Sequence, residues 1–445
     1  MSKFIRGYPQ TRLKRRGRII VHERRENIMT DMMSLEDARA IVLSKVPLQQ
    51  IETVPLLEAV GRVAAEDICS DVDVAPFAHA AMDGYAVHEK DLAKANPDHP
   101  VALEVIGEVP AGAVFDDSIG TGQCVRIMTG ARVPDSVDAV IKYEIVEVVE
   151  GDGHCGSRVS FSAPARKREN IREAGEEARK GQVVISAGDV VSGAGVGFLA
   201  GCGVMDVPTY RRPTVAIIAT GSELVDPHEV PKSGKIRNSN SYALAACVQE
   251  LGCTPTILPA VADIEESIAD EVTSACESYD LVVTTGGACN GDYDFIKEVT
   301  RSLGDLYLST VNMRPGKAQT FGLIKGVPVF GLPGNPAAAY VGFQMIVRPA
   351  LRKMQGYVHL DCPMVYAALT KDIHKHDPRR TFMRSTMVKT KNGYEVTPAR
   401  NQSSGLFGVI QKSNCMAIIS EGTKGCVKGD KVPCLLLDVS EEVAL

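Results

Sequence analysis

Near the start of its globular part, the chain has a helical pattern of hydrophobic and polar positions. Ser34 and Asp37 have the spacing of a capping box, and apolar residues recur at helical intervals after them. The pattern predicts helices over Leu35–Lys45 and Pro55–Ala65, the second with proline near its start.

Farther along, the pattern changes to short apolar runs separated by glycine, proline and aspartate turns. These runs extend from Asp71 to about Ser162 and predict a small β-rich domain. Another helix is expected over Val190–Gly201. Because helical segments stand on both sides, we expect residues 34–70 and 165–208 to form one elongated linker and dimerisation domain, with the β-rich domain (71–164) inserted into it.

The second half of the chain alternates apolar strand runs with helical segments, which is typical of an open parallel sheet. We assign residues 209–355 to this domain and residues 356–445, which return to strand-and-turn patterning, to a small β-barrel. The predicted strands are Thr214–Ala219, Thr254–Val261, Asp280–Thr285, Tyr307–Val311 and Val327–Gly331, and the helices are Ser239–Leu251, Ile264–Ser278, Tyr293–Ser302 and Ala337–Met354. The fold class is therefore multidomain, α+β and α/β.

Composition narrows the functional classes. The 445 residues carry a net charge of −6 and no tryptophan, which argues against a nucleic-acid partner. The cysteines form no Cys-x-x-Cys pair, and no apolar run is long enough to cross a bilayer, so we expect a cytoplasmic protein without membrane contact. Residues 1–33 are basic and are expected to be a disordered tail or translated upstream sequence.

Glycine-rich turns follow several predicted strands. One turn continues through Gly286 and Gly287 to Asp292 and Asp294. Glycines let a ligand approach the backbone, a following helix start favours anions, and carboxylates favour Mg²⁺. Because the carboxyl ends of parallel strands share one edge, we expect this turn to meet Thr220-Gly-Ser-Glu223 and Gly331-Leu-Pro-Gly-Asn-Pro336.

A basic pair is expected at the same edge. Arg314 and Lys317 bracket a Pro-Gly turn, so both side chains can face one oxyanion. Considered alone, Arg-x-x-Lys is more often a solvated surface turn, and it is the neighbouring turns that favour a binding role. Asp83 and Thr129 are, on sequence alone, ordinary turn and strand-end residues. Cys289 is interpreted as a passive small residue rather than a reactive thiol.

Taken together and in this order, these motifs resemble the molybdopterin molybdenumtransferase family, which includes the bacterial MoeA proteins and the E domain of gephyrin. The resemblance runs from about Met33 to the C-terminus. The matching motifs are Ala81-Met-Asp-Gly-Tyr-Ala86, Arg126-Ile-Met-Thr-Gly130, Thr220-Gly-Ser-Glu-Leu224, Gly286-Gly287 through Gly291-Asp-Tyr-Asp294, Arg314-Pro-Gly-Lys317, Gly331-Leu-Pro-Gly-Asn-Pro336, Gln402-Ser-Ser-Gly405 and Asn414.

The resemblance implies a homodimer that takes adenylylated molybdopterin and molybdate, releases AMP and leaves molybdenum on the dithiolene, with Mg²⁺ assisting. It also implies a contact with the adenylyltransferase protein of the same pathway. Carried over residue by residue, it implies catalytic roles for Asp83, Thr129, Glu223, Asp292 and Asp294, with Glu223, Asp292 and Asp294 as metal ligands. It implies substrate contacts for Gly286, Gly287, Cys289, Arg314, Lys317, Pro333, Gly334, Asn335, Pro336 and Ser404.

Several positions depart from the family pattern. Ser222 and Glu176 stand where aspartate is usual, and Cys289 stands where a small hydroxyl residue is common. The resemblance therefore leaves open a divergent paralogue that handles tungstate, and a non-catalytic scaffold. A different nucleotide-processing enzyme that shares only the parallel-sheet domain is disfavoured, because it would not share the Asp83 and Thr129 motifs.

Overall fold

The computed structural model describes residues 32–287, 295–437 and 439. Its contacts divide the chain into two compact units, one made of residues 1–50 and 210–445 and the other of residues 51–209. They are called unit 1 and unit 2 below. The expected basic tail lies outside the described residues, except for Met32 and Met33.

Unit 1 contains a six-stranded sheet in the order β16-β13-β17-β21-β20-β18. The first four strands pair in parallel, as the alternation of strands and helices predicted. β20 was not predicted and is antiparallel to both of its neighbours, so β18 runs in the same direction as β21. The strands are β13 (Thr214–Ala219), β16 (Thr254–Ile257), β17 (Leu281–Thr285), β18 (Gly304–Thr310), β20 (Ala318–Ile324) and β21 (Val327–Leu332).

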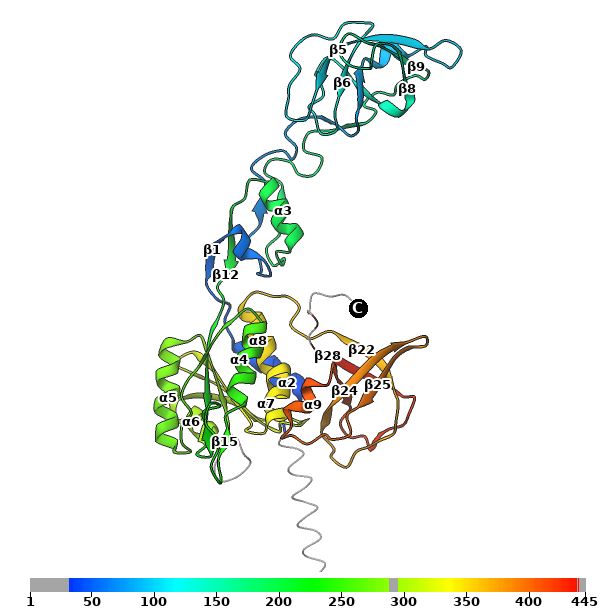
Figure 1. Cartoon of the computed structure of the whole chain (residues 1–445). Helices are drawn as coiled ribbons and strands as arrows, with labels where there is room; N and C mark the ends of the chain where they lie inside the picture. The colour runs from blue at the N-terminus through cyan, green and yellow to red at the C-terminus, as the bar shows by residue number, and fades with distance from the viewer. Residues whose placement is uncertain (1–31, 288–294, 438, 440–445) are drawn as a thin grey trace, which may run out of the picture. The chain divides into compact units, whose positions relative to one another are not determined.

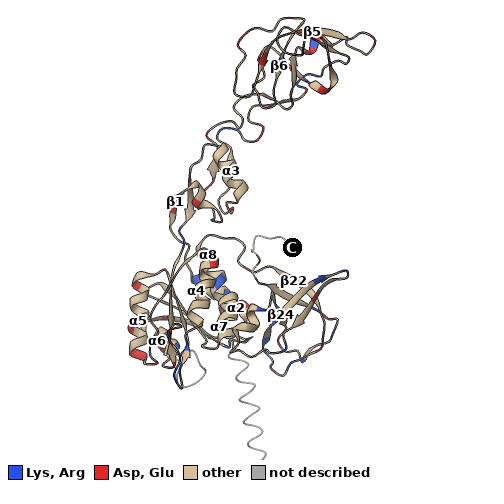
Figure 2. Ribbon diagram, in the orientation of Figure 1, with Lys and Arg blue, Asp and Glu red and all other residues tan. Residues whose placement is uncertain are grey.

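Helices cover both faces of this sheet (Figure 1). The side chains of β13 alternate between the faces: Val215 and Ile217 join one core, and Ala216 and Ile218 join the other. α4 (Asn240–Glu250), α7 (Pro336–Gly342), a π-helical turn (Phe343–Val347) and α8 (Arg348–Met354) pack in the first core. α5 (Glu265–Ser278) and α6 (Phe295–Leu303) pack in the second, and the exposed face of α5 carries acidic residues (Figure 2).

α2 (Leu35–Lys45) is capped by Ser34, whose hydroxyl accepts a hydrogen bond from the Asp37 N–H. Its buried face, Leu35, Ala38 and Val42, belongs to the same core as α4 and α8. The helix therefore packs with the parallel-sheet unit, whereas the sequence interpretation grouped it with the linker domain. The helix and its apolar face were predicted correctly. Periodicity in the sequence does not identify the domain against which such a face packs.

The C-terminal part of unit 1 is a closed barrel. Its strands follow the order β24-β25-β22-β28-β26, and an additional pairing of β26 with β24 closes the ring. They are β22 (Met364–Leu369), β24 (Arg380–Thr390), β25 (Gly393–Pro398), β26 (Cys415–Ile419) and β28 (Lys431–Leu436). The short strand β19 (Met313–Arg314) pairs with β24 and so ties the sheet domain to the barrel. Outside the ring lie β23 (Ile373–His374), β27 (Gly425–Cys426) and the short helix α9 (Phe407–Gln411).

Unit 2 contains the predicted β-rich domain, a six-stranded sheet in the order β7-β4-β6-β5-β9-β8. Its strands are β4 (Gly84–Val87), β5 (Val101–Val109), β6 (Gln123–Ile127), β7 (Ala139–Lys142), β8 (Val146–Glu150) and β9 (Arg158–Phe161). The helix expected over Val190–Gly201 is α3 (Gly193–Gly201).

The helix expected over Pro55–Ala65 is wrong. The chain there forms β1 (Ile51–Pro55), which pairs with β12 (Asp206–Tyr210), and then the 3₁₀ turn η1 (Leu56–Ala59). Leu57 and Val60 are exposed, so the apolar residues do not form one continuous buried face. Within the described part of the chain, no helix combines the length and apolar character needed to span a membrane.

Candidate functional site

The three predicted turns meet at one edge of the unit 1 sheet. Thr220 N–H donates to the carbonyl of Thr285, and Gly286 N–H donates to the carbonyl of Leu332. Gly286 has φ +97°, and a Cβ added there would lie 2.1 Å from the Thr220 carbonyl oxygen. A glycine is therefore required where the turns after β13 and β17 cross. The shared edge predicted from the sequence is confirmed.

A small cavity of about 70 Å³ lies at this edge, lined by Glu223, Gly286, Gly334 and Pro336 among others. Gly287 continues the same turn next to the Thr220 hydroxyl. The sequence analysis missed Asn240, whose amide donates to Thr285 Oγ1 (2.8 Å) and to the Gly334 carbonyl (2.9 Å). Asn240 thus fixes the turn after β17 against the turn after β21.

The donor chemistry of the small cavity suits a hard cation. Glu223 supplies a carboxylate, and the buried Thr220 Oγ1 and Asn240 Oδ1 have no hydrogen-bond partner among the described residues. Oxygen atoms of these kinds are the ligands that Mg²⁺ prefers. The described residues contain no group of three or more His, Cys, Asp or Glu side chains that could hold a metal. Asp292, Asp294 and Cys289 lie outside the described residues, so the predictions for them stay predictions.

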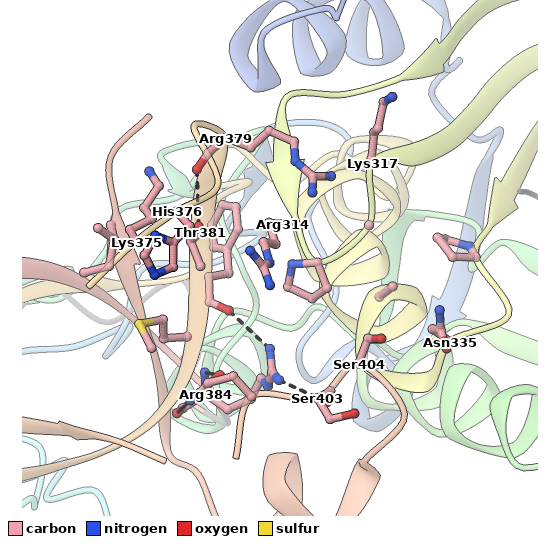
Figure 3. Close-up of a pocket in the computed structure, with 18 of the residues that line it drawn as sticks. Arg314, Lys317, Asn335, Lys375, His376, Arg379, Thr381, Arg384, Ser403 and Ser404 are labelled. Carbon is pink, nitrogen blue, oxygen red and sulfur yellow. Dashed lines mark hydrogen bonds between the residues drawn. The ribbon is translucent and has the colours of Figure 1, made fainter. Parts of the chain in front are cut away.

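A larger cavity of about 760 Å³ lies beside the same edge, between the Arg314–Lys317 turn and the barrel (Figure 3). Among the predicted residues it is lined by Arg314, Lys317, Pro333, Asn335 and Ser404. The backbone N–H of Ala337, at the start of α7, donates to the Ser404 carbonyl at 2.7 Å. The turn after β21 lines both cavities, with Pro333 and Asn335 in the larger and Gly334 and Pro336 in the smaller.

The turn that carries the basic pair is built around Gly316. This residue has φ +92°, and an added Cβ would lie 2.6 Å from the Gln319 side-chain nitrogen, so the turn requires glycine. The Lys317 ammonium makes no hydrogen bond or ion pair with any described residue, and Arg314 makes one long contact, 3.4 Å to Asp377. Both cations therefore keep donors for a ligand.

Arg384 is the functional candidate that the sequence analysis missed. Its guanidinium lines the large cavity, yet the residue is only 2% exposed. It donates weakly to the carbonyls of Phe382 (3.4 Å) and Ser403 (3.2 Å), and its Nε has no partner among the described residues (Figure 3). Burial, together with the nearby Arg314, lowers the pKa of Arg384, because both disfavour its charged form.

A signal for Arg384 was present in the sequence. Phe382 and Arg384 stand two residues apart on β24, so they share one face of the strand, and Phe382 on that face packs in the core of the parallel-sheet domain. A cation at such a position needs an anionic partner, and in the described structure none is present.

In unit 2 the structure brings Asp83 and Thr129 together. One Asp83 carboxylate oxygen accepts hydrogen bonds from both the hydroxyl and the backbone N–H of Thr129, each at 2.6 Å. These bonds lower the pKa of Asp83. The two residues are therefore hydrogen-bonded to each other. On sequence alone, Asp83 had been interpreted as an ordinary turn residue and Thr129 as an ordinary strand-end residue.

Comparison with known proteins follows the same division of the chain. The family model for the MoeA N-terminal region (domains I and II) matches residues 33–203, that for a probable molybdopterin binding domain matches residues 216–353, and that for the MoeA C-terminal region (domain IV) matches residues 366–437. This chain belongs to the MoeA family of molybdopterin molybdenumtransferases.

Individual relatives agree with this assignment. The molybdopterin molybdenumtransferase of Bacillus subtilis (strain 168) is 36% identical over 391 residues, covering 87% of this chain and 90% of that protein. The enzyme of the same name from Staphylococcus aureus (strain COL) is 35% identical over 396 residues, covering 88% and 93%. The crystal structure of the MoeA protein from Pyrococcus horikosii matches with a TM-score of 0.79 and 32% identity, covering 91% of this chain and 99% of that one.

One departure from the family pattern has a local explanation in the structure. Ser222 accepts on its hydroxyl from the Asp263 N–H (3.4 Å), and its own N–H donates to the Asp263 carboxylate (3.1 Å). Asp263 thus places a carboxylate beside position 222, where the resemblance led us to expect aspartate.

Proposed function

We propose that this chain inserts molybdenum from molybdate into adenylylated molybdopterin and releases AMP. The observation that carries the proposal is the large cationic cavity, in which the buried Arg384 guanidinium has no anionic partner among the described residues. A buried cation without a partner costs free energy, and a bound oxyanion offsets that cost.

The two adjoining cavities suit the two halves of the substrate pair. Arg314, Lys317 and Arg384 bind molybdate in the large cavity, with Ser404 and Asn335 as further polar contacts. The sheet edge at Gly286 and Gly334 receives the phosphate anhydride, because backbone N–H groups at strand-to-helix turns favour anions. The turn after β21 lines both cavities, which supports binding of the oxyanion next to the pterin substrate.

Mg²⁺ belongs to the proposal as the ion that neutralises charge on the phosphates during cleavage. Glu223 holds it together with Asp292 and Asp294, of which only Glu223 lies within the described residues. The unpaired oxygens of Thr220 and Asn240 support a hard cation at this edge.

The proposal includes a homodimer in which Asp83 and Thr129 serve the cleft of the partner subunit. Mixing two inactive variants tests this arrangement. If Asp83→Asn and Lys317→Ala subunits exchange, mixed dimers regain one intact cleft and recover activity, whereas a cleft built within one subunit recovers none.

The reaction itself is tested with purified protein, adenylylated molybdopterin and molybdate, with Mg²⁺ or with a chelator. AMP release and formation of molybdenum cofactor, both dependent on molybdate and Mg²⁺, are expected. Replacing molybdate by tungstate in a parallel reaction distinguishes a tungstate-handling paralogue. Absence of AMP release under all these conditions, with a folded protein, would favour a non-catalytic scaffold.

A further inference from the structure

The charges around the large cavity are unequal. Its cationic lining residues are Arg314, Lys317, Lys375, Arg379 and Arg384. Within the described part of the chain, the carboxylate that forms salt bridges with members of this set is that of Asp377. Lys375 contacts the carbonyl of Ser420 instead, and Arg384 contacts carbonyls.

Asp377 is held firmly against the cavity wall. Its Oδ1 accepts from the backbone N–H (3.0 Å) and the Nε–H (2.8 Å) of Arg379, and its Oδ2 accepts from Nη2 of the same residue. The same Oδ2 lies 3.4 Å from Nη1 of Arg314. The Asp377 side chain is 15% exposed. Hydrogen bonds from Arg379 lower its pKa to about 2, so the carboxylate is ionised at neutral pH.

This carboxylate occupies the donors that a bound oxyanion would use. The Asp377 carboxylate accepts hydrogen bonds from Nε and Nη2 of Arg379. It also lies beside the guanidinium of Arg314, a residue predicted to contact the substrate. We propose that Asp377 is a resident counter-ion that lowers the affinity of the cavity for divalent oxyanions. The inference deepens the proposed function and rests on it, because it assumes that the cavity binds an oxyanion.

The charge effect is expected to exceed any positioning effect. An oxyanion hydrogen-bonded to Arg314 would be centred on the order of 6 to 8 Å from the Asp377 carboxylate, given ordinary hydrogen-bond lengths. Coulomb repulsion across that distance is appreciable for a divalent anion, and it is about half as large for a monovalent one. By contrast, the contact of Asp377 with Arg314 is long, so little orientation of Arg314 depends on it.

A counter-ion of this kind has a functional consequence. A cavity that combines several cations with no opposing charge would hold any divalent oxyanion, including the sulfate and phosphate that are abundant in cells. Partial neutralisation by Asp377 lowers the affinity for such anions, so that bound anions exchange, the substrate anion can enter and the products can leave.

The decisive variant is Asp377→Asn, with Glu277→Gln as the control. Asparagine keeps an oxygen that can accept from the Arg379 N–H and Nε–H, and so it removes the charge with little change of shape. Glu277 likewise pairs with a cation, since Lys325 Nζ donates to its Oε1 at 2.5 Å and this hydrogen bond lowers the pKa of Glu277. Neither Glu277 nor Lys325 lines the cavity.

The experiment measures binding of tungstate and perrhenate to the full-length proteins by calorimetry. Both anions are tetrahedral and similar in size, but tungstate is divalent and perrhenate is monovalent. For Asp377→Asn we expect roughly 5- to 10-fold tighter tungstate binding and about 2- to 3-fold tighter perrhenate binding, a ratio set by the anion charge. For Glu277→Gln we expect less than about a 2-fold change with either anion.

The outcomes separate the two hypotheses. If the wild-type protein and Asp377→Asn bind tungstate with equal affinity, the counter-ion hypothesis is wrong. It is also wrong if the variant binds tungstate and perrhenate more weakly by the same factor. Either result leaves the proposed function standing. Failure of both the wild-type protein and the variant to bind tungstate would overturn the proposed function and the counter-ion together.

Discussion

Replacing Arg384 by methionine should separate stability from ligand binding. Methionine has a similar length and no charge, and it would occupy a position that is now 2% exposed. The guanidinium contacts two carbonyls at 3.2 and 3.4 Å, leaves Nε unpaired among the described residues and has Arg314 as a charged neighbour. Exchanging a buried charge without an ionic partner for an apolar side chain removes a desolvation cost, so Arg384→Met should be at least as stable to unfolding as the wild type.

The same substitution should cost most of the oxyanion affinity. A hydrogen bond to a charged group contributes about 1.5 to 3 kcal/mol, so losing the guanidinium should weaken tungstate binding by roughly 10- to 150-fold. At a ligand concentration about 100 times its dissociation constant, tungstate should stabilise the wild-type protein by about 2.7 kcal/mol. At the same tungstate concentration, Arg384→Met should keep only about 0.3 to 1.4 kcal/mol of this stabilisation.

The assay is denaturant or thermal unfolding with and without tungstate, together with calorimetric binding. Arg380→Met is the matched control, because Arg380 stands on the same strand but pairs with Glu421 and Glu36 outside the cavity. It should keep tungstate binding. A strongly destabilised Arg384→Met protein that still binds tungstate as tightly as the wild type would refute this account of the buried cation.

The other predictions concern residues assigned from the sequence. Lys317→Ala should raise half-saturation by molybdate at least about tenfold while changing the KM for adenylylated molybdopterin much less, because one unpaired ammonium is lost; initial rates at varied concentrations of each substrate check this. Asp292→Ala should abolish molybdenum insertion with an unchanged circular dichroism spectrum and an unchanged mass in solution, and normal turnover would remove Asp292 from the mechanism. Cys289→Ser should retain activity within about tenfold of the wild type, about 1.4 kcal/mol of barrier, and a larger loss would show that the thiol participates.

Much of the fold could be predicted because the relevant signals are local. The strands β13, β17 and β21 are short apolar runs bounded by glycine or polar turns, and their parallel pairing follows from the helices between them. β20 was not predicted, because the sequence around it was interpreted only for the Gly316 turn and the basic pair. In the structure, Ala318–Ile324 is almost entirely buried. The error over Pro55–Ala65 has another cause, since local periodicity does not register pairing with the distant strand β12.

The residues of the candidate site also fall into those that local sequence signals predict and those that they do not. The turns at Gly286 and Gly316 could be predicted because each has a local backbone requirement that glycine satisfies. Asn240 could not be chosen in this way, because its amide bonds Thr285 and Gly334, which lie 45 and 94 residues away. Asp377 and Arg384 were missed for another reason, since their place beside the cavity becomes evident only when Arg314, 63 residues from Asp377, is brought near them. The Asp83–Thr129 pair is intermediate, since each residue was singled out but their hydrogen bonds join positions 46 apart.

The position of Arg384 is best explained by what binds beside it. The Gln402 side chain accepts a hydrogen bond from the Arg384 backbone N–H (3.1 Å) and donates one to the Arg384 carbonyl (2.9 Å). The Arg384 guanidinium donates to the carbonyl of Ser403. The next residue, Ser404, accepts from the Ala337 N–H at the start of α7. A single barrel turn therefore fixes an uncompensated cation and also anchors the helix that follows the sheet-edge turn. A buried charge without an anionic partner among the described residues costs free energy, so this placement supports the proposal that an anion binds in the cavity.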